Sequence, residues 1–157
     1  MPTLSFPSVV TKVDTTARFP LGYEVELPAT ALNTGSQVWV YVHAVAALAN
    51  GLVAMRGDAV TIKSVILATV NVAARRIVGV AQHTIAINSY GFILKSGLGE
   101  VQASDAGTDQ ANQPLVTHAA GQADLMIGGE EQAVFAHSTE NGSGAASLMT
   151  CWINCLG

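Results

Sequence analysis

The chain has 157 residues, half of them apolar and only 11% charged. This length suits one domain, and it is enough to bury a core without help from a metal or a disulfide. Soluble domains usually carry roughly 25% charged residues, so we expect much of this surface to be covered by copies of the chain or by a partner. A monomer with a polar face rich in Ser, Thr, Asn and Gln is the alternative.

Charge is distributed unevenly along the chain. Residues 1–95 contain all seven Lys and Arg and four acids, a net charge of +3, whereas residues 96–157 contain seven acids and no Lys or Arg. Surfaces of opposite sign would favour ordered contacts between subunits, unless folding mixes the charges. Nucleic-acid binding is not expected, because the basic residues are scattered and the adjacent pair Arg75 and Arg76 is not interleaved with aromatics. No apolar run approaches the ~18 residues of a membrane-spanning helix, so we expect no membrane partner.

The first 22 residues are predicted to form an extended arm, since they contain three prolines and show no helical period. Short strands separated by glycines and polar turns follow, and residues 23–157 are predicted to form a single β domain. The predicted strands are 23–27, 36–45, 52–55, 59–65, 76–82, 90–95, 99–103, 115–117, 122–127, 132–137 and 148–154. Helical turns are expected only at 44–49 and 68–76. The fold class predicted is mainly all-β, an antiparallel β-barrel or β-sandwich with an extended N-terminal arm.

The clearest strand, residues 36–45, alternates between two kinds of side chain. Val38, Val40 and Val42 share one face, and Trp39, Tyr41 and His43 share the other. The valine face is predicted to line the core, and the aromatic face is predicted to meet a partner.

Motifs of enzymes and cofactor sites are missing from the sequence. There is no Gly-x-Ser-x-Gly, phosphate-binding loop or His-Glu-x-x-His, and Gly97-Leu98-Gly99 is interpreted as a turn. The four histidines (His43, His83, His118 and His137) are widely spaced, and none has a carboxylate at ligand spacing. We therefore expect no enzyme activity, no cofactor and no metal. Without an export signal, Cys151 and Cys155 should be reduced, buried thiols that act as small apolar residues.

One segment carries a resemblance to a known family. Residues 78–82, Ile85, residues 89–94 and Gly97 resemble a hairpin of the capsid decoration, or cement, proteins of tailed bacteriophages. The stretches 35–44, 48–51 and 120–124 also fit this family, so the resemblance extends over about residues 33–127. It implies a β-rich structural protein of the virion, made in the host cytoplasm, which binds the outer surface of an assembled head and stabilises it by bridging subunits of the major capsid protein.

The implied partners are the major capsid protein and further copies of the chain, with a homotrimer expected. Seven apolar or aromatic residues are the candidates for partner contact: Phe6, Val9, Val10, Phe19, Trp39, Tyr41 and Tyr90. Two other classes of function stay open. The first is a carbohydrate-binding or host-adhesion module of a phage virion, with Trp39, Tyr41 or Tyr90 as the stacking platform. The second is an enzyme that uses a His and an Asp brought together by the fold.

Overall fold

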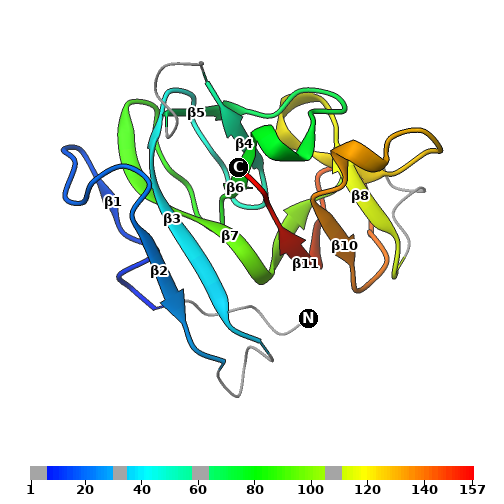
Figure 1. Cartoon of the computed structure of the whole chain (residues 1–157), viewed down its shortest axis with the longest axis horizontal. Coiled ribbons are helices and arrows are strands. Elements are labelled where there is room, and N and C mark those ends of the chain that lie inside the picture. The colour runs from blue at the N-terminus through cyan, green and yellow to red at the C-terminus, as the bar shows by residue number, and fades with distance from the viewer. Residues whose placement is uncertain (1–6, 30–34, 58–63, 105–110) are drawn as a thin grey trace.

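The computed structural model of the chain describes residues 7–29, 35–57, 64–104 and 111–157, and strands dominate these ranges (Figure 1). The strands are β1 (Val13–Asp14), β2 (Glu24–Leu27), β3 (Gln37–Ala44), β4 (Val53–Arg56), β5 (Ser64–Leu67), β6 (Ile77–Val80), β7 (Ser89–Gln102), β8 (Pro114–Thr117), β9 (Ala123–Leu125), β10 (Ala136–Ser138) and β11 (Leu148–Asn154). Three short 3-10 turns, η1 (Ala74–Arg76), η2 (Ala119–Gly121) and η3 (Glu131–Ala133), are the helical elements of the described ranges. The predicted all-β class is confirmed.

Five strands close into a barrel. Strands β3, β5, β4, β6 and β7 are hydrogen-bonded in that order, and β7 returns to pair with β3. Every pair is antiparallel except β3 with β5, which run parallel. The interior is filled by small and branched side chains, among them Val40, Val42, Val65, Val78 and Ile93. Val40 and Val42 therefore line a core, as the alternation predicted, whereas Val38 is half-buried.

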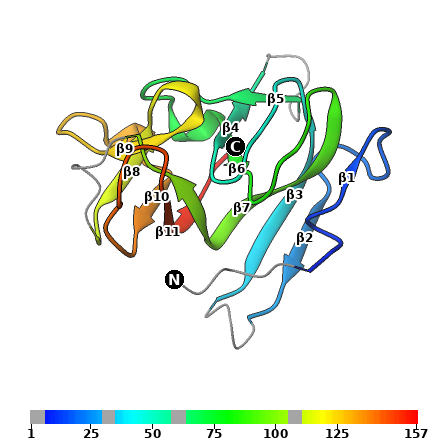
Figure 2. The same ribbon diagram turned by 180° about the vertical axis from the view of Figure 1, so that it is seen from behind.

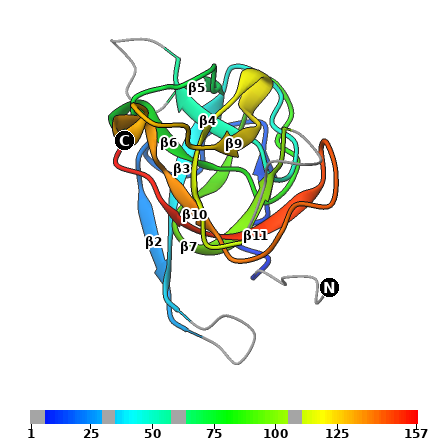
Figure 3. The same cartoon turned by 90° about the vertical axis from the view of Figure 1, so that its right-hand side faces the viewer.

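An outer sheet extends from the second half of β7. Strand β11 pairs with β7 from Asn154, which lies opposite Ser96, to Leu148, which lies opposite Gln102. Strands β10, β8 and β9 follow β11 in that order (Figures 1 and 2). Figure 3 views the molecule from the side on which these strands lie. Since β7 contributes to both barrel and outer sheet, one strand joins the two parts of the fold.

The turn predicted at Gly97-Leu98-Gly99 is wrong, because β7 runs through it. Val38 lies opposite Ser96 whereas Trp39 lies opposite Leu94, so Lys95 is an extra residue on β7. Such a bulge bends and twists the strand without ending it. Gly97, two residues after the bulge, has a φ of +114°, a value that residues with a Cβ rarely adopt.

Residues 7–22 pack on the barrel. Strand β1 pairs with the beginning of β7, and Val10 is completely buried. The Phe19 ring stacks on Tyr23, with centroids 5.4 Å apart, and contacts Tyr41 at 5.3 Å. Over residues 7–22 the expected extended arm is therefore packed on the barrel, and residues 1–6 lie outside the described residues. The physical reason is that the sheet offers an aromatic face which Phe19 and Val10 can cover.

The aromatic face of β3 is consequently buried. Trp39 and Tyr41 are both 0% exposed and belong to a second core, between the barrel, the outer sheet and residues 7–22. The Trp39 indole N–H donates to Gln37 Oε1 at 3.3 Å. The prediction that this face is presented to a partner is corrected, since the chain's own residues cover it.

Helical turns were predicted at 44–49 and 68–76, and only the second region contains one, η1. Within the predicted strand 132–137, the first residues form η3 and the strand itself begins at Ala136. The predicted last strand, 148–154, coincides with β11.

Candidate interaction surface

The seven candidate contact residues are placed in different environments. Phe6 lies outside the described residues, and Val9 is 50% exposed. Phe19 and Tyr90 are half-buried, whereas the remaining three, Val10, Trp39 and Tyr41, are fully buried. They therefore do not form one exposed face.

Three of these residues meet in an aromatic cluster. Tyr41 is stacked on Tyr90, with ring centroids 6.3 Å apart, and Phe19 meets the Tyr41 ring edge-on. The His43 ring stacks on the Tyr90 ring, with centroids 4.7 Å apart. The cluster ties the N-terminal residues to β3 and β7, so its first role is to hold the fold together.

A different surface is exposed on the outer sheet. Trp152 of β11 lies directly opposite Leu98 of β7 and opposite His137 of β10, and His137 lies opposite Pro114 of β8. Residues directly opposite in an antiparallel pair project on the same face of the sheet. Leu98, Trp152, His137 and Pro114 thus form a row across four strands, here called the Trp152 row. Trp152 is 43% exposed, His137 is exposed, and the two ends of the row are half-buried.

The alternation of β11 explains why Trp152 faces outward. Met149, Cys151 and Ile153 are buried in the core, and the side chains between them lie on the opposite face. Thr150 and Asn154 flank Trp152 on that outward face. This alternation is visible in the sequence, and it was the signal by which Trp152 could have been recognised as a surface residue.

The surroundings of the Trp152 row are acidic. Glu100 lies two residues beyond Leu98 on the same face, and its Oε2 accepts a hydrogen bond from Asn50 Nδ2 at 2.8 Å. Glu140 Oε1 accepts the backbone N–H of Thr150 at 2.5 Å. Because residues 96–157 contain no Lys or Arg, β8 to β11 contribute no basic group except His137 to this face.

Four apolar side chains among the N-terminal residues are also exposed. Val9, Val13, Leu21 and Tyr23 are 50%, 36%, 38% and 46% exposed. Two basic residues belong to the same segment: Lys12 is exposed, and the Arg18 side chain is 55% exposed and lies 3.7 Å from Asp14. The same segment holds Asp14, and the exposed Glu24 and Glu26 follow on β2, so acids balance its two basic residues. Strands β1 and β2 lie at one end of the long axis of the molecule, and β8 and β10 lie toward the other (Figures 1 and 2).

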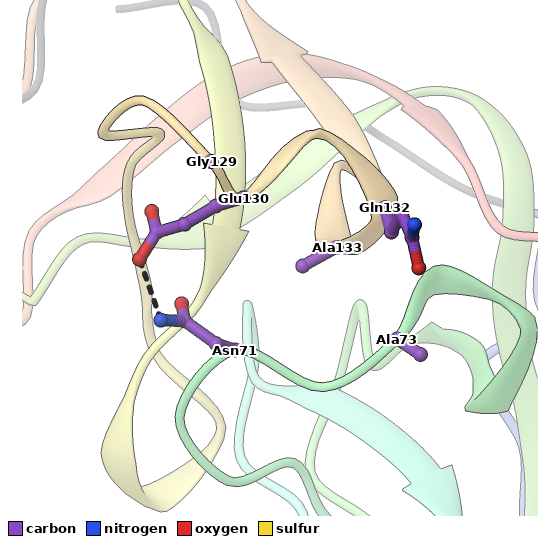
Figure 4. Close-up of a pocket in the computed structure, with 6 residues that line it drawn as sticks. All are labelled: Asn71, Ala73, Gly129, Glu130, Gln132 and Ala133. Carbon is purple, nitrogen blue, oxygen red and sulfur yellow. Dashed lines mark hydrogen bonds between the residues drawn. The ribbon is translucent and has the colours of Figure 1, made fainter.

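A shallow hollow of about 370 Å³ lies beside η3 (Figure 4). It is lined by Asn71, Ala73, Gly129, Glu130, Gln132 and Ala133. The carboxylate of Glu130 is its ionisable group. Its Oε1 accepts from Asn71 Nδ2 at 2.5 Å, and its Oε2 accepts the backbone N–H of Ile127 at 2.9 Å. Both carboxylate oxygens thus hold the local chain in place.

Two other ionisable groups are withdrawn from solvent, since His83 is half-buried and Cys155 is buried. Burial lowers the pKa of His83 to about 4, and within the described ranges neither ring nitrogen has a hydrogen-bond partner. Burial raises the pKa of Cys155 to about 12, against a smaller opposing effect of Lys95. Both cysteines are buried, as predicted. Across residues 7–29, 35–57, 64–104 and 111–157, no three His, Cys, Asp or Glu side chains gather closely enough to hold a metal ion. The same ranges contain no helix that is long and apolar enough to span a bilayer.

Fold and surface together define a five-stranded β-barrel that carries an outer sheet with Trp152 exposed on one face. No protein-family model and no curated protein matches the sequence. Among solved structures, the chain is similar to the N base of the head fiber protein gp8.5 of bacteriophage phi29. The TM-score is 0.57 at 16% identity, and the match covers 75% of this chain and 94% of that chain. At this identity the two chains share a fold.

Proposed function

We propose that this chain is a structural protein of a phage virion that binds the outside of an assembled head as a decoration, or cement, protein. The observation that carries the proposal is the likeness of its fold to the base of a phage head fiber, over nearly the whole of that base. The resemblance of residues 78–97 to the decoration-protein hairpin supports it independently, because that resemblance was found in the sequence alone.

The proposed mechanism is stabilisation by binding. A protein that binds only the assembled shell stabilises that shell by mass action, with about 2.7 kcal/mol per site at a hundredfold excess over the dissociation constant. A homotrimer that bridges neighbouring subunits of the major capsid protein would add avidity, since each further contact becomes intramolecular. No step of this mechanism needs a catalytic group, a nucleotide or a metal, and we propose that the chain is not an enzyme.

The test is direct binding to shells. Purified protein is mixed with empty, expanded capsids from its source phage, the capsids are sedimented, and bound protein is quantified against capsid protein. We expect saturable binding at a fixed number of copies per shell, and visible added density on the outer surface by electron microscopy. Absence of binding at concentrations that saturate known decoration proteins would contradict the proposal.

An adhesion module that binds glycans is the second candidate, and the exposed Trp152 favours it. A Trp ring on a flat sheet is a common platform for stacking of sugars. Trp39 and Tyr41 cannot serve this purpose while they are buried. Glycan arrays probed with the wild-type chain and with Trp152→Thr separate the candidates, because a decoration protein should show no sugar preference in either form.

A further inference from the structure

We propose that Asn141 and Gly142 form a site of spontaneous covalent modification, at which the Asn141 side chain loses ammonia and becomes aspartate or isoaspartate. The chain itself is the substrate, and water is the other reactant. The inference does not rest on the proposed function, because it concerns the folded chain alone and is tested without capsids.

The reaction needs an Asn side chain followed by an accessible backbone nitrogen. The nitrogen of Gly142 gives up its proton to solvent and attacks Asn141 Cγ, so that an N–C bond forms and Oδ1 takes the negative charge. The Cγ–Nδ2 bond then breaks, and Nδ2 takes up a proton and leaves as ammonia. Water opens the resulting five-membered succinimide at either carbonyl, which gives aspartate or isoaspartate. Gly is the most favourable second residue, because it has no Cβ to hinder the attack.

The sequence contains two Asn-Gly pairs, Asn50-Gly51 and Asn141-Gly142. Local sequence gives both the same chemistry, since in each the nitrogen belongs to a glycine. The structure separates them by what the reacting atoms contact.

The reacting groups of the second pair are available. Asn141 is exposed and Gly142 is half-buried, in the connection between β10 and β11. Among the described residues, none accepts a hydrogen bond from the Gly142 N–H, so this nitrogen loses no such bond when it attacks. Asn141 Oδ1 accepts the backbone N–H of Ala111 at 2.8 Å. A donor at this oxygen stabilises the negative charge that develops there during the attack.

The first pair is held by hydrogen bonds at both reacting groups. The Gly51 N–H donates to the Ala81 carbonyl oxygen at 2.7 Å, and the Gly51 carbonyl oxygen accepts the Gln102 N–H at 2.9 Å. Nδ2 of Asn50, the atom that would leave, donates to Glu100 Oε2 at 2.8 Å. Gly51 is also buried. Attack there would break two of these bonds and move buried backbone, and each lost bond adds to the barrier.

Modification at Asn141 would change both charge and backbone. The product carries one more negative charge, in a half of the chain, residues 96–157, that holds seven acids and no Lys or Arg. In isoaspartate the former side-chain carbonyl becomes part of the main chain, so the contact with the Ala111 N–H is disrupted. Ala111 lies just before β8, which begins at Pro114. The modified chain therefore loses an anchor between the β10–β11 connection and the segment that leads into β8.

The experiment follows both pairs in the same molecule. The full chain is kept folded for several weeks in mildly alkaline buffer at body temperature, and samples are digested at mildly acidic pH, at which little succinimide forms. Mass spectrometry of the two Asn-Gly peptides measures conversion of the amide to the acid, and an isoaspartyl methyltransferase measures isoaspartate. We expect Asn141 to react at least about tenfold faster than Asn50, and to give both products.

Two controls separate structure from sequence. In concentrated urea the two pairs should react at similar rates, because the contacts that protect Asn50 are then lost. Asn141→Gln changes an exposed position and would have to close a less favourable six-membered ring, so it should abolish the product in its own peptide and leave the rate at Asn50 unchanged.

Three results would overturn the inference. Equal rates at the two pairs in folded protein would mean that the structure does not distinguish them. Modification of Asn141 only after denaturation would mean that the folded chain protects this pair as well. Formation of aspartate without isoaspartate would indicate direct hydrolysis, in which the Gly142 nitrogen takes no part.

Discussion

The Tyr41 hydroxyl of β3 donates a hydrogen bond to Asp14 Oδ2 of β1 at 3.2 Å. The hydroxyl oxygen of Tyr41 also accepts a hydrogen bond from the backbone N–H of Arg18 at 3.2 Å. Burial raises the pKa of Tyr41, so the hydroxyl stays protonated and able to donate at physiological pH. One side chain of the barrel thus engages two points of the N-terminal segment.

Replacement of Tyr41 by Phe should loosen that segment. The change leaves the Arg18 N–H and the Asp14 carboxylate without this partner, and we expect the free energy of unfolding to fall by about 1–2 kcal/mol. Limited proteolysis should cleave residues 7–22 faster, and urea denaturation measures the stability. Tyr23→Phe is the control, because Tyr23 is 46% exposed. Equal proteolysis of both variants would mean that the hydroxyl does not anchor the segment.

The covering of β3 shows which features a sequence predicts and which it does not. The alternation of residues 36–45 correctly separated the two faces of the strand, because side-chain direction follows from the backbone period. It could not tell what lies on each face. The aromatic face is covered by Phe19 and Val10, which are distant in sequence and have no period of their own. Tertiary packing of this kind is invisible to local patterns.

The same limit applies to β7 and to the Trp152 row. Glycines at 97 and 99 suggested a turn, but both lie inside one long strand, where a Cβ on either would come closer than 3 Å to a neighbouring atom. The bounds of β11 were predicted correctly. That Trp152 lies beside Leu98 and His137 follows only from strand order and register, which the sequence alone did not provide.

Substitution of Gly97 by Ala tests whether this position requires a residue without a Cβ. Gly97 has a φ of +114°, and a Cβ there would lie 2.7 Å from the Ser36 carbonyl oxygen. Strain and this clash should lower the free energy of unfolding by about 2 kcal/mol or more, measured by urea denaturation. Gly128→Ala is the matched control, because nothing lies within 4 Å of the position of its Cβ, and it should change stability by less than about 0.5 kcal/mol. Similar stability of the two variants would show that Gly97 is not constrained.

Burial of His83 predicts a dependence of stability on pH. The pKa of His83 is lowered to about 4 in the folded chain from 6.5 in the unfolded chain. As the pH falls, the unfolded state therefore binds the proton first. The contribution of His83 to stability is constant above pH 6.5, and stability falls as the pH drops from 6.5 to about 4. The shift limits this loss to about 3 kcal/mol. A His83→Gln variant should show a shallower decline over this window, and parallel curves for the two proteins would contradict the prediction.

The two thiols should resist modification. Cys151 and Cys155 are buried, and the raised pKa of Cys155 keeps its thiol protonated and unreactive at neutral pH. A thiol reagent such as dithionitrobenzoate should label neither residue in folded protein within minutes and both in 6 M guanidinium. The denatured sample is the internal control for the reagent. Rapid labelling of the native chain would mean that β11 opens readily from the core.

The proposed role predicts that the protein raises the resistance of filled heads to heat. Binding to the assembled shell alone must stabilise it, and small increments per site add up over many sites. Phage particles from which the protein has been removed are heated with and without added protein, and DNA release is followed with a dye that does not enter intact heads. We expect release to shift to a higher temperature in proportion to occupancy, which sedimentation and gel analysis measure.

Heads treated with heat-denatured protein serve as the control for nonspecific effects of added protein. Equal release curves at demonstrated full occupancy would contradict stabilisation, and they would favour the adhesion module, whose contacts with the head need only attach it.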